Sequence, residues 1–134
     1  MTRLFTALLI AAALMPAPAA AACLGSNPAI THVSVINHTT SGQVSRYHLV
    51  GTVTNEGTSG QPSNTLQFVT IWHDTDKVDS RGIPPLALGA SYNFSYDWLR
   101  APDAGAGTTK LTFRMDVRSG SNCNPANGTY SVTF

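Results

Sequence analysis

Hydrophobic residues are distributed in two different ways along this chain. Residues 4–15 form an almost uninterrupted apolar run, whereas the later residues alternate between short apolar segments and clusters of Gly, Pro, Asn and Ser. Short segments rich in Val, Ile, Thr, Tyr and Phe between such clusters are typical of β-strands and their turns. The pattern therefore predicts an all-β domain preceded by a separate N-terminal segment.

Seven strands are predicted in this domain. In the sixth, Leu111, Phe113 and Met115 alternate with Thr112 and Arg114, as in an antiparallel strand with one solvated face. No helical periodicity follows the N-terminal segment, so we expect almost no helix. The fold class predicted is an immunoglobulin-like, seven-stranded antiparallel β-sandwich. Its strands are expected at residues 30–37, 45–55, 65–73, 77–80, 90–98, 108–118 and 128–134.

The two tryptophans receive different interpretations. Trp98 continues the apolar face of its strand and is predicted to lie in the core. Trp72 lies on a strand that is partly apolar on both faces, so one of these faces is free to meet a partner. We take Trp72, His73 and Asp74 as the candidate partner-contact residues.

The N-terminal segment has the order of a secretory signal peptide. A short basic start containing Arg3 precedes the apolar run, and small residues fill 19–22. The run is about a dozen residues, well below the roughly 20 that cross a bilayer. We therefore predict a cleaved signal peptide at 1–22, a mature domain at 23–134 that does not insert into a membrane, and a periplasmic, secreted or cell-surface location.

Two cysteines, Cys23 and Cys123, belong to the predicted mature domain. An exported chain meets an oxidising compartment, and an even cysteine count favours pairing, so we expect one disulfide between them. The alternative is that Cys23 carries the lipid of a bacterial lipoprotein. That signal prefers Leu three positions earlier, where this chain has Ala20.

Charge argues against one class of partner. Without the N-terminal segment, seven basic residues balance seven acidic ones, and they are scattered along the chain. Nucleic-acid binding needs clustered Lys and Arg to replace phosphate counterions. We therefore expect no nucleic-acid partner, and an envelope or extracellular protein or glycan remains.

Several short segments of the mature chain resemble the bacterial cell-adhesion-related domain CARDB and its relative, the APHP domain. Residues 53–58 (VTNEGT) resemble the strand-end pattern of that family, and 86–91 (LALGAS) resemble the entry to its next strand. Residues 111–117 (LTFRMDV) resemble the strand after that. The resemblance implies an immunoglobulin-like module for adhesion or interaction and implies no catalytic residues. The family's acidic tail segment is missing, because residues 119–127 contain no acid.

No catalytic or cofactor motif is found in the sequence. The chain has neither a G-x-S-x-G elbow nor an H-E-x-x-H motif. Residues 105–110 (GAGTTK) superficially suggest a phosphate-binding loop, but they lack the G-K-[ST] ending and a following helix. We expect a non-enzyme without a cofactor.

Metal ligands are sparse. His48 and His73 would face each other if their strands paired, which leaves a periplasmic copper carrier as an alternative function. Asp74, Asp76 and Asp79 cluster around a predicted turn, but they lack the glycine and terminal glutamate of an EF-hand. We assign no metal site. The expected function is an exported binding or structural module of the bacterial cell envelope, and a small secreted inhibitor or enzyme accessory protein is a further alternative.

Overall fold

The structure, a computed structural model, describes residues 23–101, 107 and 109–134, so the predicted signal peptide lies outside the described residues. All seven predicted strands are present. None of the helices in these residues is long and apolar enough to span a membrane. The elements are β1 (Pro28–Ser41), β2 (Val44–Asn55), β3 (Leu66–His73), β4 (Asp76–Ile83), β5 (Ser91–Arg100), β6 (Lys110–Ser119), the 3-10 helix η1 (Pro125–Asn127) and β7 (Thr129–Thr133).

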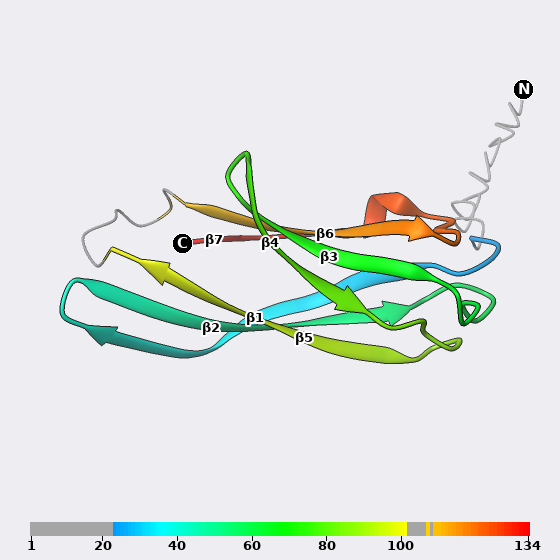
Figure 1. The fold of residues 1–134 in the computed structure, drawn as a ribbon, viewed down its shortest axis with the longest axis horizontal. Helices are drawn as coiled ribbons and strands as arrows, with labels where there is room; N and C mark the ends of the chain where they lie inside the picture. The colour runs from blue at the N-terminus through cyan, green and yellow to red at the C-terminus, as the bar shows by residue number, and fades with distance from the viewer. Residues whose placement is uncertain (1–22, 102–106, 108) are drawn as a thin grey trace, which may run out of the picture.

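The strands form two antiparallel sheets packed face to face (Figure 1). One sheet has the order β1-β2-β5 and the other has the order β4-β3-β6-β7. In immunoglobulin constant domains the fourth strand pairs with the fifth, whereas here β4 pairs with β3. The predicted seven-stranded immunoglobulin-like sandwich is confirmed, with its fourth strand in the sheet of the third.

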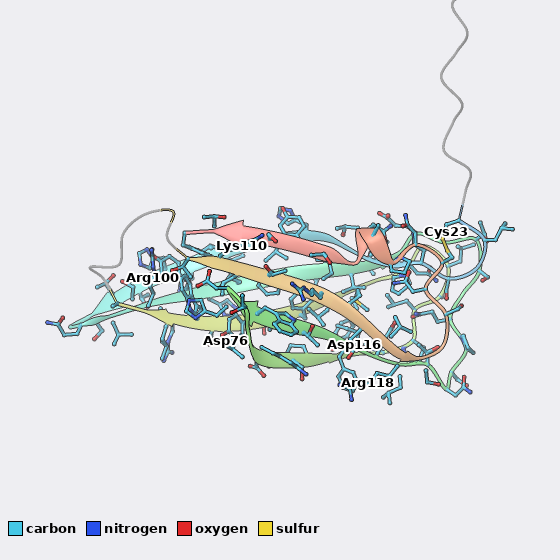
Figure 2. The ribbon with its side chains drawn as sticks, turned by 90° about the horizontal axis from the view of Figure 1, so that it is seen from above. Cys23, Asp76, Arg100, Lys110, Asp116 and Arg118 are labelled. Atoms are coloured by element: carbon cyan, nitrogen blue, oxygen red, sulfur yellow. A yellow bond between two sulfur atoms is a disulfide. The ribbon has the colours of Figure 1, made fainter. Side chains whose placement is uncertain are left out.

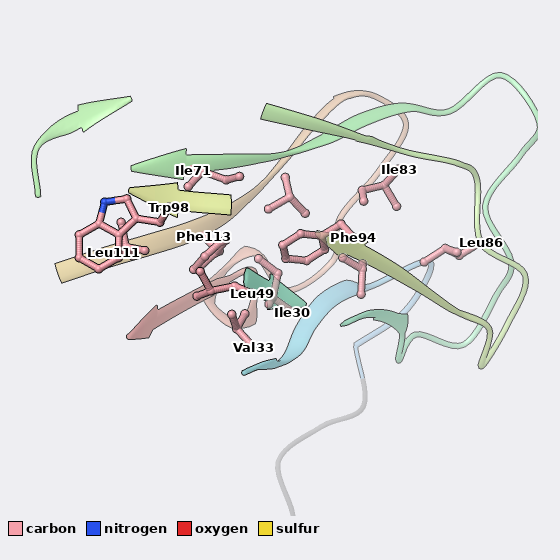
Figure 3. Packing of buried hydrophobic residues seen from close by; sticks show 12 residues of the cluster. Ile30, Val33, Leu49, Ile71, Ile83, Leu86, Phe94, Trp98, Leu111 and Phe113 are labelled. Atoms are coloured by element: carbon pink, nitrogen blue, oxygen red, sulfur yellow. The ribbon is translucent and has the colours of Figure 1, made fainter. Parts of the chain in front are cut away.

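The core lies between the two sheets, where the inward residues of each strand meet (Figure 3). Strand alternation decides which residues these are. Trp98, predicted to lie in the core, belongs to this cluster and is 7% exposed, and Tyr96 of the same strand packs against it. Fully buried members are Val53, Val69, Ile71, Leu111 and Phe113.

Two strands are longer than predicted. The first continues four residues past the predicted Asn37, and β4 continues three residues past Ser80. These extensions contain no alternating apolar pattern. Cross-strand pairing forms them instead, because Thr39 pairs with Arg46 in β2 and Ile83 pairs with Gln67 in β3.

A disulfide joins Cys23 to Cys123, with the Cα atoms 5.6 Å apart, as predicted. Nearby, the Cys123 N–H donates to the carbonyl of Ser26, and the Ser26 hydroxyl donates to the carbonyl of Ser121. The first and last strands, which the disulfide ties near each other, do not share an edge. β1 and β7 end different sheets and contact each other across the sandwich without a shared ladder, because β7 pairs only with β6.

Asn55 anchors three loops at the same end of the sandwich. Its Oδ1 accepts from the backbone N–H groups of Asn27 and Gly57, and its Nδ2 donates to the carbonyls of Ser59 and Leu86. The chain passes so close here that a Cβ on Gly57 would lie 2.0 Å from the Gly25 carbonyl oxygen. We call this region, with the disulfide, the disulfide end.

The opposite end is filled by aromatic rings. Tyr47, Trp98 and Phe134 pack with ring centroids 4.7 to 5.4 Å apart, and His38 stacks on Tyr47 at 4.1 Å. Such contacts add about 0.5 to 1.5 kcal/mol per pair beyond area burial. We call these four residues the aromatic end.

Arg81 links the two sheets along one side. Its Nε–H donates to the carbonyl of Ser95 in β5, its Nη1 lies 2.7 Å from Asp79 Oδ2, and its guanidinium lies over the Tyr96 ring. Burial raises the pKa of Tyr96, and the charge of Asp79 adds to this. For Asp79, burial alone would raise the pKa, but the Ser80 N–H and Arg81 lower it more.

Candidate functional site

β3 presents two aromatic side chains on the solvent side of the four-stranded sheet. Alternation points Val69 and Ile71 into the core, where both are fully buried, and leaves Phe68, Thr70 and Trp72 on the outer face. The Trp72 Nε1–H donates to Thr70 Oγ1 at 3.0 Å, which holds the indole along its own strand. Both aromatic rings are half-buried, so part of each remains open to solvent.

β6 places an arginine over each of these rings. The Arg114 guanidinium carbon lies 4.7 Å from the Trp72 ring centroid, and that of Arg118 lies 5.1 Å from Phe68. Cation–π contacts of this kind contribute about 0.5 to 1 kcal/mol at exposed sites. Arg118 also donates to Asp116, whereas the guanidinium of Arg114 makes no hydrogen bond or ion pair among the described residues. The planar donor fork of Arg114 is therefore held in place and unused.

The same outer face concentrates positive charge. Lys77 of β4 is the cross-strand partner of Trp72. Lys110 lies four positions before Arg114 on β6, so the two residues lie on the same face of the sheet. By the register of β3, β4 and β6, Asp116 is the one acid on this face within the described strands. Figure 2 labels it next to Arg118. A chain with nearly balanced charge thus carries a basic, aromatic surface. We call it the aromatic–arginine face, made of Phe68, Thr70, Trp72, Lys77, Lys110, Arg114, Asp116 and Arg118.

The face is open beside Phe68. Gly82 pairs with Phe68 across the β3–β4 ladder, so no side chain from β4 covers that flank. A Cβ built on Gly82 would meet no atom within 4 Å. The surface around the Phe68 ring can therefore receive an approaching group.

The structure places Trp72 apart from His73 and Asp74, the other two predicted partner-contact residues, whose side chains lie together with His73 Nε2 3.6 Å from Asp74 Oδ2. Trp72 lies on the aromatic–arginine face, but His73 points to the other sheet, with its ring 6.1 Å from that of Trp98. Asp74 shapes the β3–β4 turn at a φ of 52°, and its Oδ1 accepts from the Lys110 N–H. His73 and Asp74 therefore adjoin each other, and Trp72 faces the opposite side of its strand.

The predicted metal candidates also lie apart. His48 and His73 belong to different sheets, so their strands do not pair, and His48 Nδ1 is bonded instead to Asp97 on the outer face of the three-stranded sheet. Asp79 is held by Arg81, away from Asp74. In the described part of the chain, no three His, Cys, Asp or Glu side chains are close enough to hold a metal ion. The glycine-rich segment 105–110 lies largely outside the described residues.

A second surface feature lies on the outer face of the three-stranded sheet. It is a shallow hollow of about 440 Å³ near the turn between β1 and β2. Its floor is a cross-strand row, because Thr39, Arg46 and Leu99 lie side by side in register. The lining residues are Thr39, Ser41, Val44, Arg46 and Leu99.

Sequence reasoning missed the role of Arg114 and Arg118. A signal existed, because Phe68 and Trp72 are four residues apart and so are the two arginines. Equal spacing on two neighbouring strands matches their side chains pair by pair. No family model, curated protein or solved structure matches this chain, so the site stands on its own geometry.

Proposed function

We propose that this chain is an exported, non-enzymatic binding module of the bacterial cell envelope, and that it contacts an acidic protein partner through the aromatic–arginine face. The observation that carries the proposal is the pair of arginine-covered aromatic rings on the solvent side of β3 and β6. The core is complete on the inner side of the same strands. These half-buried rings are therefore not needed to complete the interior, and their open parts are available for recognition.

The residue types support a protein partner. Trp and Arg are enriched among the residues that dominate binding energy at protein interfaces. An arginine stacked on a ring loses little further freedom when it pairs with a carboxylate, because its fork is already oriented. Arg114, with its unused donors beside Trp72, has this arrangement.

The charge of the face supports an acidic partner. Four basic side chains stand against Asp116, and only Arg118 is paired with it. Complementary charge accelerates encounter and sets orientation, and salt screens it. Binding to such a partner should weaken as ionic strength rises.

The cysteine pair supports export. A disulfide across a sequence separation of 100 needs an oxidising compartment to form and persist. The signal-peptide pattern of residues 1–22 points to the same location. Outside the cell a partner must be recognised without chaperone assistance, which suits a rigid sandwich.

Capture from the envelope fraction of the source cells tests the proposal. The immobilised mature domain is compared with a variant carrying Trp72→Ala and Arg114→Ala. The matched control carries Thr52→Ala and Asn93→Ala, two exposed residues bonded to each other on the outer face of the three-stranded sheet. We expect one protein to be retained by the parent and the control at low salt and lost by the double variant. Loss of both side chains should weaken binding at least about 30-fold, the effect of one strong hot spot.

Two results contradict the proposal. If the parent, the double variant and the control retained the same partner equally, the binding surface would lie outside the aromatic–arginine face. A retained protein whose binding is indifferent to both salt and Gly82→Glu would remove the acidic-partner argument. This substitution adds a negative charge beside Phe68 where space is open.

A further inference from the structure

The two sheets have four edge strands, and these differ in how they are protected. The edges are β1 and β5 in one sheet and β4 and β7 in the other. An unprotected edge offers a row of backbone N–H and C=O groups that can pair with another chain. Natural sheets discourage this with charged residues, bulges, short strands or side chains that cover the edge.

Three of the edges carry such protection. At β5, the Arg81 side chain donates a hydrogen bond to the carbonyl of Ser95 and so makes this acceptor unavailable to another chain. β4 carries Lys77, Asp79 and Arg81 and is interrupted by an irregularity opposite Ile71 and Trp72. β7 has only five residues.

β1 has two irregularities, between Ile30 and His32 and between Val35 and Asn37, but it lacks the other forms of protection. It has 14 residues, the longest strand of the described fold, and contains no Asp, Glu, Lys or Arg. Its beginning is covered, because it contacts β7 and η1 across the sandwich. Its second half is open, with Val35 39% exposed and Ile36 60% exposed. After the irregularity between Val35 and Asn37, the strand runs regularly through Ser41, with only β2 beside it.

We propose that the open half of β1, residues 35–41, pairs antiparallel with the same segment of a second copy of this chain. An antiparallel pair of identical strands has a two-fold axis, so both copies use one self-complementary patch. The segment has no fixed charge, so self-pairing opposes no like charges. The pair also shields Val35 and Ile36 from water.

The edges also set the size of the assembly. Because the other three edges are protected, β1 pairing consumes the open edge of each copy and ends at a dimer. The three-stranded sheets of two copies then join as one six-stranded sheet. The aromatic–arginine face lies on the other sheet and stays free in both copies.

Sedimentation equilibrium of the mature domain tests this dimer directly. A single strand pair buries less area than a standard interface, so we examine concentrations from about 5 to about 500 µM, where small interfaces associate. We expect a monomer–dimer equilibrium and no larger species. Ile36→Lys places two positive charges near the two-fold axis and should weaken the dimer at least about tenfold.

Val78→Lys is the matched control, since Val78 is an apolar residue of β4 with 46% exposure. It should leave the dimer unchanged. If Ile36→Lys loses its β circular dichroism, Asn37→Lys on the same open segment replaces it. A monomer at every concentration, or a dimer that persists in the folded lysine variant, overturns the proposal. Sedimentation uses the purified domain without an envelope partner, so its outcome does not depend on the capture experiment that tests the proposed function.

Discussion

The two ends of the sandwich are closed by different chemistry. At the disulfide end, a covalent bond and directed hydrogen bonds through Asn55 join the N-terminal segment to loops from both sheets. At the aromatic end, Tyr47, Trp98 and Phe134 close the space by ring packing. In the described part of the chain, no covalent link crosses that second end.

The difference shows how one domain can combine fixed and adaptable closure. Hydrogen bonds to a buried amide require defined distances and angles, so the disulfide end holds one loop geometry. Ring contacts depend mainly on buried area and tolerate small shifts. Stability at the aromatic end should therefore follow side-chain size, and stability at the disulfide end should follow oxidation state.

The largest effect is expected at the aromatic end. Trp98→Ala should lower the free energy of unfolding by about 3 to 5 kcal/mol, since it removes a large buried side chain and leaves a cavity. Urea denaturation measures it. Leu99→Ala is the control, because Leu99 is the next residue on β5 and is 57% exposed. Equal losses for both variants would mean that ring packing does not close this end.

At the disulfide end, replacing Cys23 and Cys123 by Ala should cost about 2 to 5 kcal/mol. The melting temperature should fall by roughly 10 °C or more for a domain of this size. Calorimetry with and without reductant measures the effect, and the parent under reducing conditions should approach the variant. The claim that a covalent bond stabilises the disulfide end would be wrong if non-reducing peptide mapping found two free thiols. It would also be wrong if the variant melted at the temperature of the parent.

The smallest effect concerns the side linked by Arg81, between the two ends. The folded-state pKa of Asp79 is lowered, so its ionised form contributes stability at neutral pH, which is lost as pH falls through that pKa. Asp79→Asn should lower the melting temperature slightly at pH 7 and leave it unchanged under strongly acidic conditions. Asp76→Asn, on the same strand, is the control. If the difference in melting temperature between Asp79→Asn and the parent grew on acidification, the ionised form of Asp79 would not be the stabilising one.

Most of the strand pattern could be predicted because alternation and turn residues are local signals. The inward faces of β5 and β6 follow from residue types alone, and burial confirms them at Phe94, Trp98, Leu111 and Phe113. Tyr92, predicted on the same inward face of β5, is instead 41% exposed. Sheet membership could not be predicted in this way. The pairing of β4 with β3 and the extension of β1 depend on backbone register between consecutive strands, which the side-chain pattern does not encode.

The candidate site was predictable only in part. The sequence marked Trp72, because its strand is apolar on both faces. The contact of Trp72 with Arg114 arises from the pairing of β3 with β6, and the two residues lie 42 positions apart in the sequence. His73 and Asp74, adjacent to Trp72 in sequence, point elsewhere because successive strand residues alternate and the turn begins at Asp74.

The position of the disulfide also determines how the domain responds to mechanical force. Cys23 lies at the disulfide end of the sandwich (Figure 2), and the C-terminal Phe134 lies toward the opposite end (Figure 1). Tension applied between these two residues passes through the sulfur–sulfur bond, so the chain from Leu24 to Asn122 cannot be pulled out. Only Asn124–Phe134 can lengthen, to about 40 Å when fully extended, instead of on the order of 370 Å for the unbridged chain. Oxidation therefore makes the domain a short, nearly inextensible link, in which η1 and β7 alone yield to load.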